Sequence, residues 1–91
     1  MIPVHLPQDL AAELKVAQRS EQPYAATLRE LLLQMDRESP GLLRRILEAD
    51  GSIRQHINVF LGERLARGAE GPLLQLRDGE EVWVIRAISG G

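Results

Sequence analysis

The sequence predicts an α+β fold in which β-strands near both ends of the chain enclose one main helix. Three observations predict it. Residues 2–6 alternate apolar and other side chains, as a strand with one buried face does. The segment that begins at Thr27 carries apolar residues at helical spacing, and residues 57–61 and 82–86 alternate again. At 91 residues, the chain is long enough to bury one core.

The first strand, residues 2–6, is bracketed by Pro3 and Pro7, which suits an edge or a strand end. A second strand is predicted from residue 14 to about residue 19. Residues 9–14 fit a helical turn equally well, so the boundary between these two elements stays open.

The main helix has the clearest start signal in the chain. Thr27 can accept a hydrogen bond from the first turn, and Glu30 completes the spacing of a capping box. One apolar stripe follows, formed by Leu28, Leu31, Leu32 and Met35. Pro40 ends the helix, because the residue before a proline is pushed out of helical geometry. A second, short helical stretch is predicted over residues 42–49.

The strand over residues 57–61 places Ile57, Val59 and Leu61 on one face and Asn58 and Phe60 on the other. A turn at Gly62-Glu63 follows it, and residues 68–72 are predicted to be loop.

Asp78-Gly79 is typical of a tight turn and leads into the last strand. We expect its apolar pair Val82 and Val84 to point into the core. Trp83 and Ile85 would then lie on the outer face.

Composition excludes several classes of function. The chain has no cysteine, which excludes disulfides and thiolate metal sites and fits a reducing cytosol. Its net charge of −2 argues against nucleic acid as a partner. No apolar run approaches the ~20 residues that span a bilayer, so no membrane partner is expected. His5 and His56 lack metal-ligand spacing, and a strand-end or hydrogen-bonded role is expected for both, with no metal site.

The chain ends in Gly90-Gly91, and this end together with the element order resembles the ubiquitin-like sulfur carriers of the MoaD/ThiS family. Its cysteine-biosynthesis and siderophore-type carriers are the most similar. Four segments carry the resemblance in this order: a Thr-Leu-rich helix start at residues 24–32, Pro40-Gly41-Leu42, His56-Ile57-Asn58-Val59-Phe60, and Asp78-Gly79-Glu80-Glu81-Val82. The resemblance implies a β-grasp (ubiquitin-like) fold, with a mixed sheet of four to five strands wrapped around one main helix. Residues 1–86 would form this domain and residues 87–91 a flexible tail.

The resemblance also implies a carrier and not an enzyme, with no cofactor of its own. An ATP-dependent adenylating enzyme related to ubiquitin-activating enzymes would activate the Gly91 carboxylate. A sulfur donor would convert it to a thiocarboxylate, and a downstream synthase would accept the sulfur in a biosynthetic pathway. Some relatives carry extra residues after the diglycine, so a processing protease is a further expected partner.

The expected site therefore has two parts. Gly91 would accept the adenylate and the sulfur, with Gly90 beside it, because side chains at these positions would block a narrow passage. The expected partner-binding residues are Phe60, Trp83, Ile85, Arg86, Ile88 and Ser89. An exposed Trp close to the only Phe is typical of an interface. Trp83 in the core is the competing interpretation. Arg44-Arg45 is expected to be a solvated helix face, with contact to an acidic partner as the alternative.

Three other functions stay open. The chain could be the small subunit of a molybdopterin synthase, a ubiquitin-like modifier that forms isopeptide bonds through Gly91, or a non-catalytic β-grasp interaction module.

Overall fold

The computed structural model describes residues 1–87 and contains one five-stranded sheet with helices against it. The elements run along the chain in this order: β1 (Ile2–His5), α1 (Gln8–Leu14), β2 (Arg19–Gln22), α2 (Leu28–Glu38), α3 (Leu42–Ile46), β3 (Ile57–Leu61), β4 (Arg64–Ala66), the 3₁₀ turn η1 (Gly71–Leu73) and β5 (Val82–Arg86).

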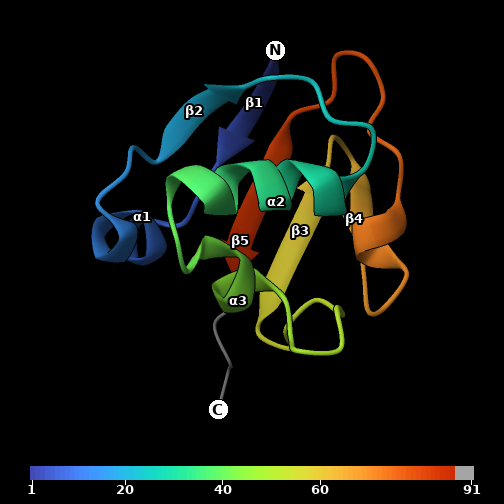
Figure 1. The fold of residues 1–91 in the computed structure, drawn as a ribbon. Coiled ribbons are helices and arrows are strands. Elements are labelled where there is room, and N and C mark those ends of the chain that lie inside the picture. The colour runs from blue at the N-terminus through green and yellow to red at the C-terminus, as the bar shows by residue number, and fades with distance from the viewer. Residues whose placement is uncertain (88–91) are drawn as a thin grey trace.

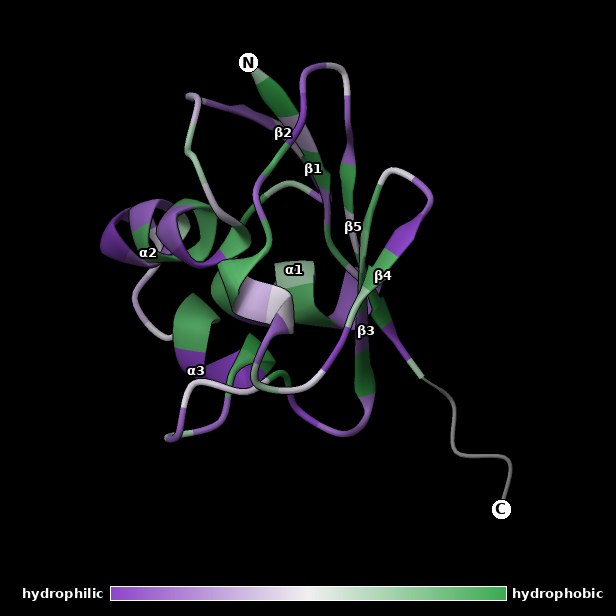
Figure 2. Cartoon of the chain, turned by 90° about the vertical axis from the view of Figure 1, so that its right-hand side faces the viewer, coloured by the Kyte–Doolittle hydropathy of each residue, from purple (hydrophilic) through white to green (hydrophobic). Residues whose placement is uncertain are grey.

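The sheet is mixed, with the strand order β2-β1-β5-β3-β4. β5 lies in the centre, parallel to β1 and antiparallel to β3, so the last strand of the chain joins its two halves. The helices cover one face of the sheet and leave the other face open (Figures 1 and 2). This arrangement confirms the predicted α+β fold with a mixed sheet around one main helix.

The core lies between the sheet and α2. Every second residue of β3 and β5 faces inward, with Val59, Leu61 and Val82 fully buried. The predicted stripe of α2 meets this face, since Leu28, Leu31, Leu32 and Met35 are all buried. Figure 2 shows the apolar sides of the helices turned toward the sheet.

The start of α2 is capped as predicted. The Thr27 hydroxyl accepts from the Glu30 backbone N–H at 3.2 Å, and the Glu30 carboxylate accepts from the Ala26 N–H at 3.0 Å. Together these bonds satisfy one backbone donor in the first turn of the helix and one just before the helix. Ser39 follows the last helical residue, in agreement with the predicted stop before Pro40.

The predicted second strand over residues 14–19 is wrong, and the helical alternative for residues 9–14 is right. α1 extends over residues 8–14 and buries Leu10 and Ala11. Lys15 ends it in a left-handed conformation at φ 59°. Because Leu14 and Val16 pack against the core from this helix end, they do not alternate along a strand. The strand itself, β2, begins only at Arg19 and pairs with β1.

Two later boundaries also differ. α3 ends at Ile46 and not at residue 49, because Leu47 is extended and forms an isolated bridge with Ile53. The predicted loop over residues 68–72 contains the start of η1. The turn at Gly62-Glu63 is confirmed and leads into β4. None of the helices in residues 1–87 combines the length and apolar character required to cross a membrane.

Candidate functional site

A single row of side chains crosses the open face of the sheet from edge to edge. Strand register aligns Arg19 of β2 with His5 of β1, and His5 with Trp83 of β5. Trp83 is aligned in turn with Phe60 of β3, and Phe60 with Leu65 of β4. Residues aligned in this way lie side by side on the same face. We call these five residues the cross-strand row.

Trp83 lies in the centre of the row and is exposed. Trp83 is 42% exposed and Ile85 is 43% exposed. Val82, which precedes Trp83, and Val84, which separates the two, are buried. The predicted inward and outward faces of β5 are therefore confirmed, and the interpretation of Trp83 as a core residue is wrong. Phe60 is half-buried beside it, so an apolar surface faces solvent on a chain with few aromatic residues.

Two neighbours hold the Trp83 ring in place. The His5 imidazole stacks on it with ring centroids 3.6 Å apart and an interplanar angle of 4°. His5 Nε2 lies 2.8 Å from Glu81 Oε1, which fixes the imidazole from its edge. The hydrogen-bonded role predicted for His5 is thus confirmed. Because the stack and the hydrogen bond restrict both rings, the tryptophan presents a preformed surface.

His5 and Glu81 were absent from the predicted docking residues. Alternation along residues 2–6 already places His5 opposite the buried Ile2 and Val4. Its contact with Trp83 depends on the parallel pairing of β1 with β5, which brings together segments from opposite ends of the chain.

Glu80 belongs to a separate cluster. Its two carboxylate oxygens accept from Arg64 Nε at 2.9 Å and Nη2 at 2.7 Å. The Arg77 backbone N–H donates to the same carboxylate at 2.8 Å. The hydrogen bond from Arg64 is the main reason that the pKa of Glu80 lies below its ordinary value. Glu80 therefore stabilises the loop before β5 and takes no part in the row.

The last described residues fix where the chain leaves the sheet. Arg86 Nε lies 2.8 Å from Asp9 Oδ2 of α1, and the Ala87 N–H donates to the His56 carbonyl at 2.7 Å. Arg86 and Asp9 are both substantially exposed, so this ion pair leaves Arg86 within reach of a partner. The other predicted site residues, Ile88, Ser89, Gly90 and Gly91, lie outside the described residues. Within residues 1–87, no group of three or more His, Asp or Glu side chains is placed to hold a metal ion.

Solved structures with the same architecture define the class of protein. CysO of Mycobacterium tuberculosis superposes with a TM-score of 0.84 at 17% identity, over 97% of this chain and 100% of that one. A chain of the BexX/CysO complex of Amycolatopsis orientalis gives a TM-score of 0.82 at 21% identity, with both chains covered completely. The molecule has the β-grasp (ubiquitin-like) fold.

The sequence places it within this class. The model of the ThiS family matches residues 4–91, and the chain belongs to that family. It is 31% identical over 65 residues to a protein of Archaeoglobus fulgidus predicted to be a sulfur carrier, covering 71% of this chain and 74% of that one. It is 33% identical over 66 residues to small archaeal modifier protein 3 of Haloferax volcanii, covering 72% and 71%. The chain is thus a sulfur carrier protein of the ThiS type.

Proposed function

We propose that the protein carries sulfur as a thiocarboxylate at Gly91. This requires Gly91 to be the last residue of the chain, so that its carboxylate is free. The supporting observation is the match of the ThiS family model, which extends over almost the whole chain and includes Gly90-Gly91. The pathway that receives the sulfur is a biosynthetic one.

Two steps load the carrier. The Gly91 carboxylate attacks the α-phosphate of ATP on an adenylating enzyme, pyrophosphate leaves, and an acyl-adenylate forms. A sulfide equivalent from the sulfur donor then attacks the acyl carbon and displaces AMP, which leaves the thiocarboxylate. A carboxylate is a poor electrophile until it is activated in this way, and the adenylate survives only where water is excluded. ATP and the sulfur donor belong to the partner enzymes, and the carrier binds no cofactor.

Recognition precedes loading, and the cross-strand row, together with Ile85 on the same face of β5, is the proposed docking surface for the adenylating enzyme. The partner contacts are Phe60, Trp83 and Ile85 on the sheet, with Arg86, Ile88 and Ser89 along the approach to Gly90-Gly91. An exposed apolar patch with a tryptophan at its centre is a favoured interface. β5 carries this patch and leads directly into residues 88–91, so docking and delivery of the carboxylate are coupled through one strand.

The remaining partners follow from the same chemistry. A sulfur-accepting synthase takes the sulfide from the thiocarboxylate, and water supplies the oxygen that restores the carboxylate. A processing protease exposes Gly91 if the primary product continues beyond it. We place all of these steps in the cytoplasm.

The test uses the protein ending at Gly91, incubated with ATP, its adenylating enzyme and a sulfide source. We expect the intact mass to increase by the exchange of one oxygen for one sulfur. Gly91→Ala and deletion of Gly91 abolish the increase, while we expect the free energy of unfolding to change by no more than about 0.5 kcal/mol. A protein without Gly91 that still gains the mass of sulfur would disprove the proposal.

One observation favours a second candidate, a ubiquitin-like modifier, because one of the relatives is named a small archaeal modifier protein. In that case the activated Gly91 forms an isopeptide bond with a lysine of another protein. Conjugates that survive thiol treatment on a denaturing gel, and that are lost on deletion of Gly91, distinguish this activity from thiocarboxylate transfer.

A further inference from the structure

A hollow of about 300 Å³ lies on the helical side of the molecule, between α2, α3 and the loop that leads to β3. Leu43 and Leu47 give it an apolar floor, since Leu47 is buried and Leu43 packs against the core. Three arginines from three different segments line it, namely Arg29, Arg44 and Arg54. One acid, Glu48, lines it as well, so positive charge predominates in this hollow of a chain whose net charge is −2.

Only one of the three arginines is engaged. Arg54 Nη1 lies 2.9 Å from Glu48 Oε1, and its Nε donates to the Arg44 carbonyl at 2.6 Å. Within residues 1–87, neither the Arg29 nor the Arg44 guanidinium makes an ion pair or a hydrogen bond. Two arginines whose guanidinium donors are available thus line a hollow with an apolar floor.

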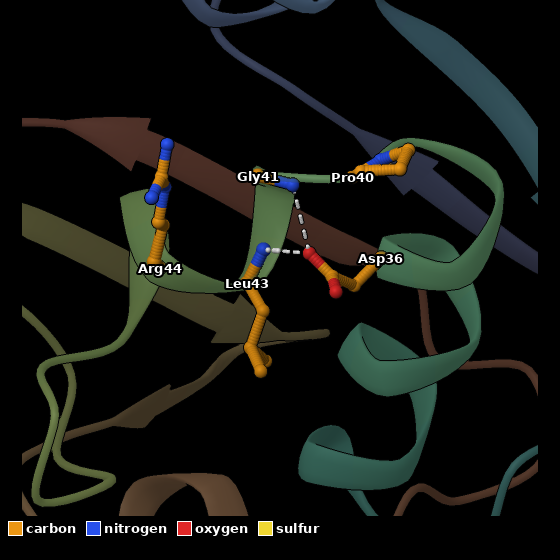
Figure 3. Close-up of a pocket in the computed structure, with 5 residues that line it drawn as sticks. All are labelled: Asp36, Pro40, Gly41, Leu43 and Arg44. Carbon is orange, nitrogen blue, oxygen red and sulfur yellow. Dashed lines mark hydrogen bonds between the residues drawn. The ribbon is translucent and has the colours of Figure 1, made fainter.

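A further acid, Asp36, has other hydrogen-bond partners. Asp36 lines an adjoining hollow of about 370 Å³ that shares Leu43 and Arg44 with the first. Its Oδ1 accepts from the Gly41 N–H at 3.1 Å and from the Leu43 N–H at 3.0 Å. Figure 3 shows Asp36 directed at these two amides, with Arg44 projecting from the far side of α3. Asp36 therefore holds the α2–α3 connection and leaves Arg44 unpaired.

We propose that this hollow docks an acidic segment of a partner protein. Carboxylates of the segment pair with Arg29 and Arg44, whose planar guanidinium groups suit bidentate hydrogen bonds. An apolar side chain between the carboxylates packs on Leu43 and Leu47. A short acidic peptide fits this combination better than nucleic acid, because the acidic remainder of the chain repels a long polyanion.

The hollow and the cross-strand row lie on opposite sides of the sheet, so a protein can bind at each. α2 and α3 lie on one side of the sheet (Figure 2). The cross-strand row lies on the other side, because its residues alternate with the buried ones along the strands. A protein bound at the hollow leaves the row free, so the carrier can contact two proteins at once. The proposal does not depend on the chemistry at Gly91.

The probe is a short synthetic peptide that alternates glutamate and leucine, titrated into the isotopically labelled full chain and followed by NMR. We expect shifts at the amides of α3 and of residues 47–54, and none at Trp83. The double variant Arg29→Gln and Arg44→Gln weakens binding about tenfold or more, the loss expected from two charged hydrogen bonds. Arg37→Gln is the matched control, because Arg37 is an exposed arginine of α2 outside the hollow. We expect Arg37→Gln to bind the peptide with an affinity within about twofold of that of the unsubstituted chain.

Several results would overturn the proposal. One is equal weakening by Arg37→Gln, which would indicate unspecific charge attraction. Others are shifts that centre on Trp83, self-association of the chain through the same amides, or an oligonucleotide that binds there while the peptide does not. Replacing glutamate by glutamine in the peptide must abolish binding, and added salt must weaken it. A peptide that binds equally well without its carboxylates contradicts the role of the arginines.

Discussion

Trp83 shows how one exposed residue can be held ready for a partner. Its ring is stacked on His5, and His5 is in turn fixed by Glu81 at 2.8 Å. An interface residue that is already ordered loses less side-chain freedom on binding, so more of its contact energy contributes to affinity. The rigidity of Trp83 therefore matters as much as its exposure.

Replacing Trp83 by serine is expected to weaken docking of the adenylating enzyme far more than it weakens the fold. The side chain is 42% exposed, so the loss of stability is limited to about 1–2 kcal/mol, from its partial burial and its stack on His5. A hot-spot tryptophan contributes about 2 kcal/mol or more to binding, which corresponds to a loss of affinity of more than tenfold. Chemical denaturation and titration calorimetry measure the two effects separately.

A buried neighbour provides the contrast. Leu61→Ala lies at a fully buried position of β3 and should cost about 2–5 kcal/mol of stability. At temperatures where it remains folded, its affinity for the enzyme should be close to that of the parent. If Trp83→Ser destabilises the protein as strongly as Leu61→Ala and binds the enzyme normally, the docking role is wrong.

At the scale of elements, the loop before β5 depends on the Glu80–Arg64 pair. Arg64 belongs to β4, and its Nη2 also donates to the Gln75 carbonyl at 2.7 Å, so one side chain joins a strand to the loop. Since the pKa of Glu80 is lowered in the folded state, the unfolded state binds the proton more readily. The stabilisation is present above the unfolded pKa, ~4.3, and is lost as the pH falls through the folded value.

We therefore expect Glu80→Gln to be less stable than the parent at neutral pH, with the difference shrinking as the pH falls below about 4.3. Urea denaturation across this range measures it. Glu63→Gln is the control, because Glu63 is exposed and, among the described residues, forms no ion pair. A difference that stays constant with pH for Glu80→Gln would show that the carboxylate charge contributes nothing.

Sequence patterns predicted the elements that carry one buried face. β3, β5 and α2 each repeat apolar residues at their own period, and the cap at Thr27 fixed the start of α2. The position of β2 was predicted wrongly for the opposite reason. Arg19–Gln22 is a polar edge strand, so no alternation of apolar residues marks its pairing with β1. The end of α3 was also predicted wrongly. It is set by the bridge of Leu47 with Ile53, a contact that the local sequence pattern does not contain.

At the scale of the whole molecule, the exposed face of the proposed docking surface could be predicted only where it follows from alternation within one strand. That rule placed Trp83 and Ile85 outside and Phe60 beside them. It could not join His5 to Trp83, because this contact requires the first and last strands to pair in parallel across the intervening chain. The two guanidinium groups of the hollow come likewise from α2 and α3, which only the folded chain brings together.

The two faces of the molecule give a final prediction for the complex with the adenylating enzyme. If the enzyme covers the cross-strand row and the neighbouring Ile85, hydroxyl-radical footprinting of the complex should show reduced oxidation of Trp83 and Ile85. Tyr24 and Leu73 are 68% and 64% exposed and lie outside the strands of the sheet, so they should remain reactive and serve as internal references. Protection of Tyr24 and Leu73 with Trp83 still reactive would place the enzyme elsewhere. Because the acidic peptide binds the helical side, adding it should leave the protection of Trp83 unchanged.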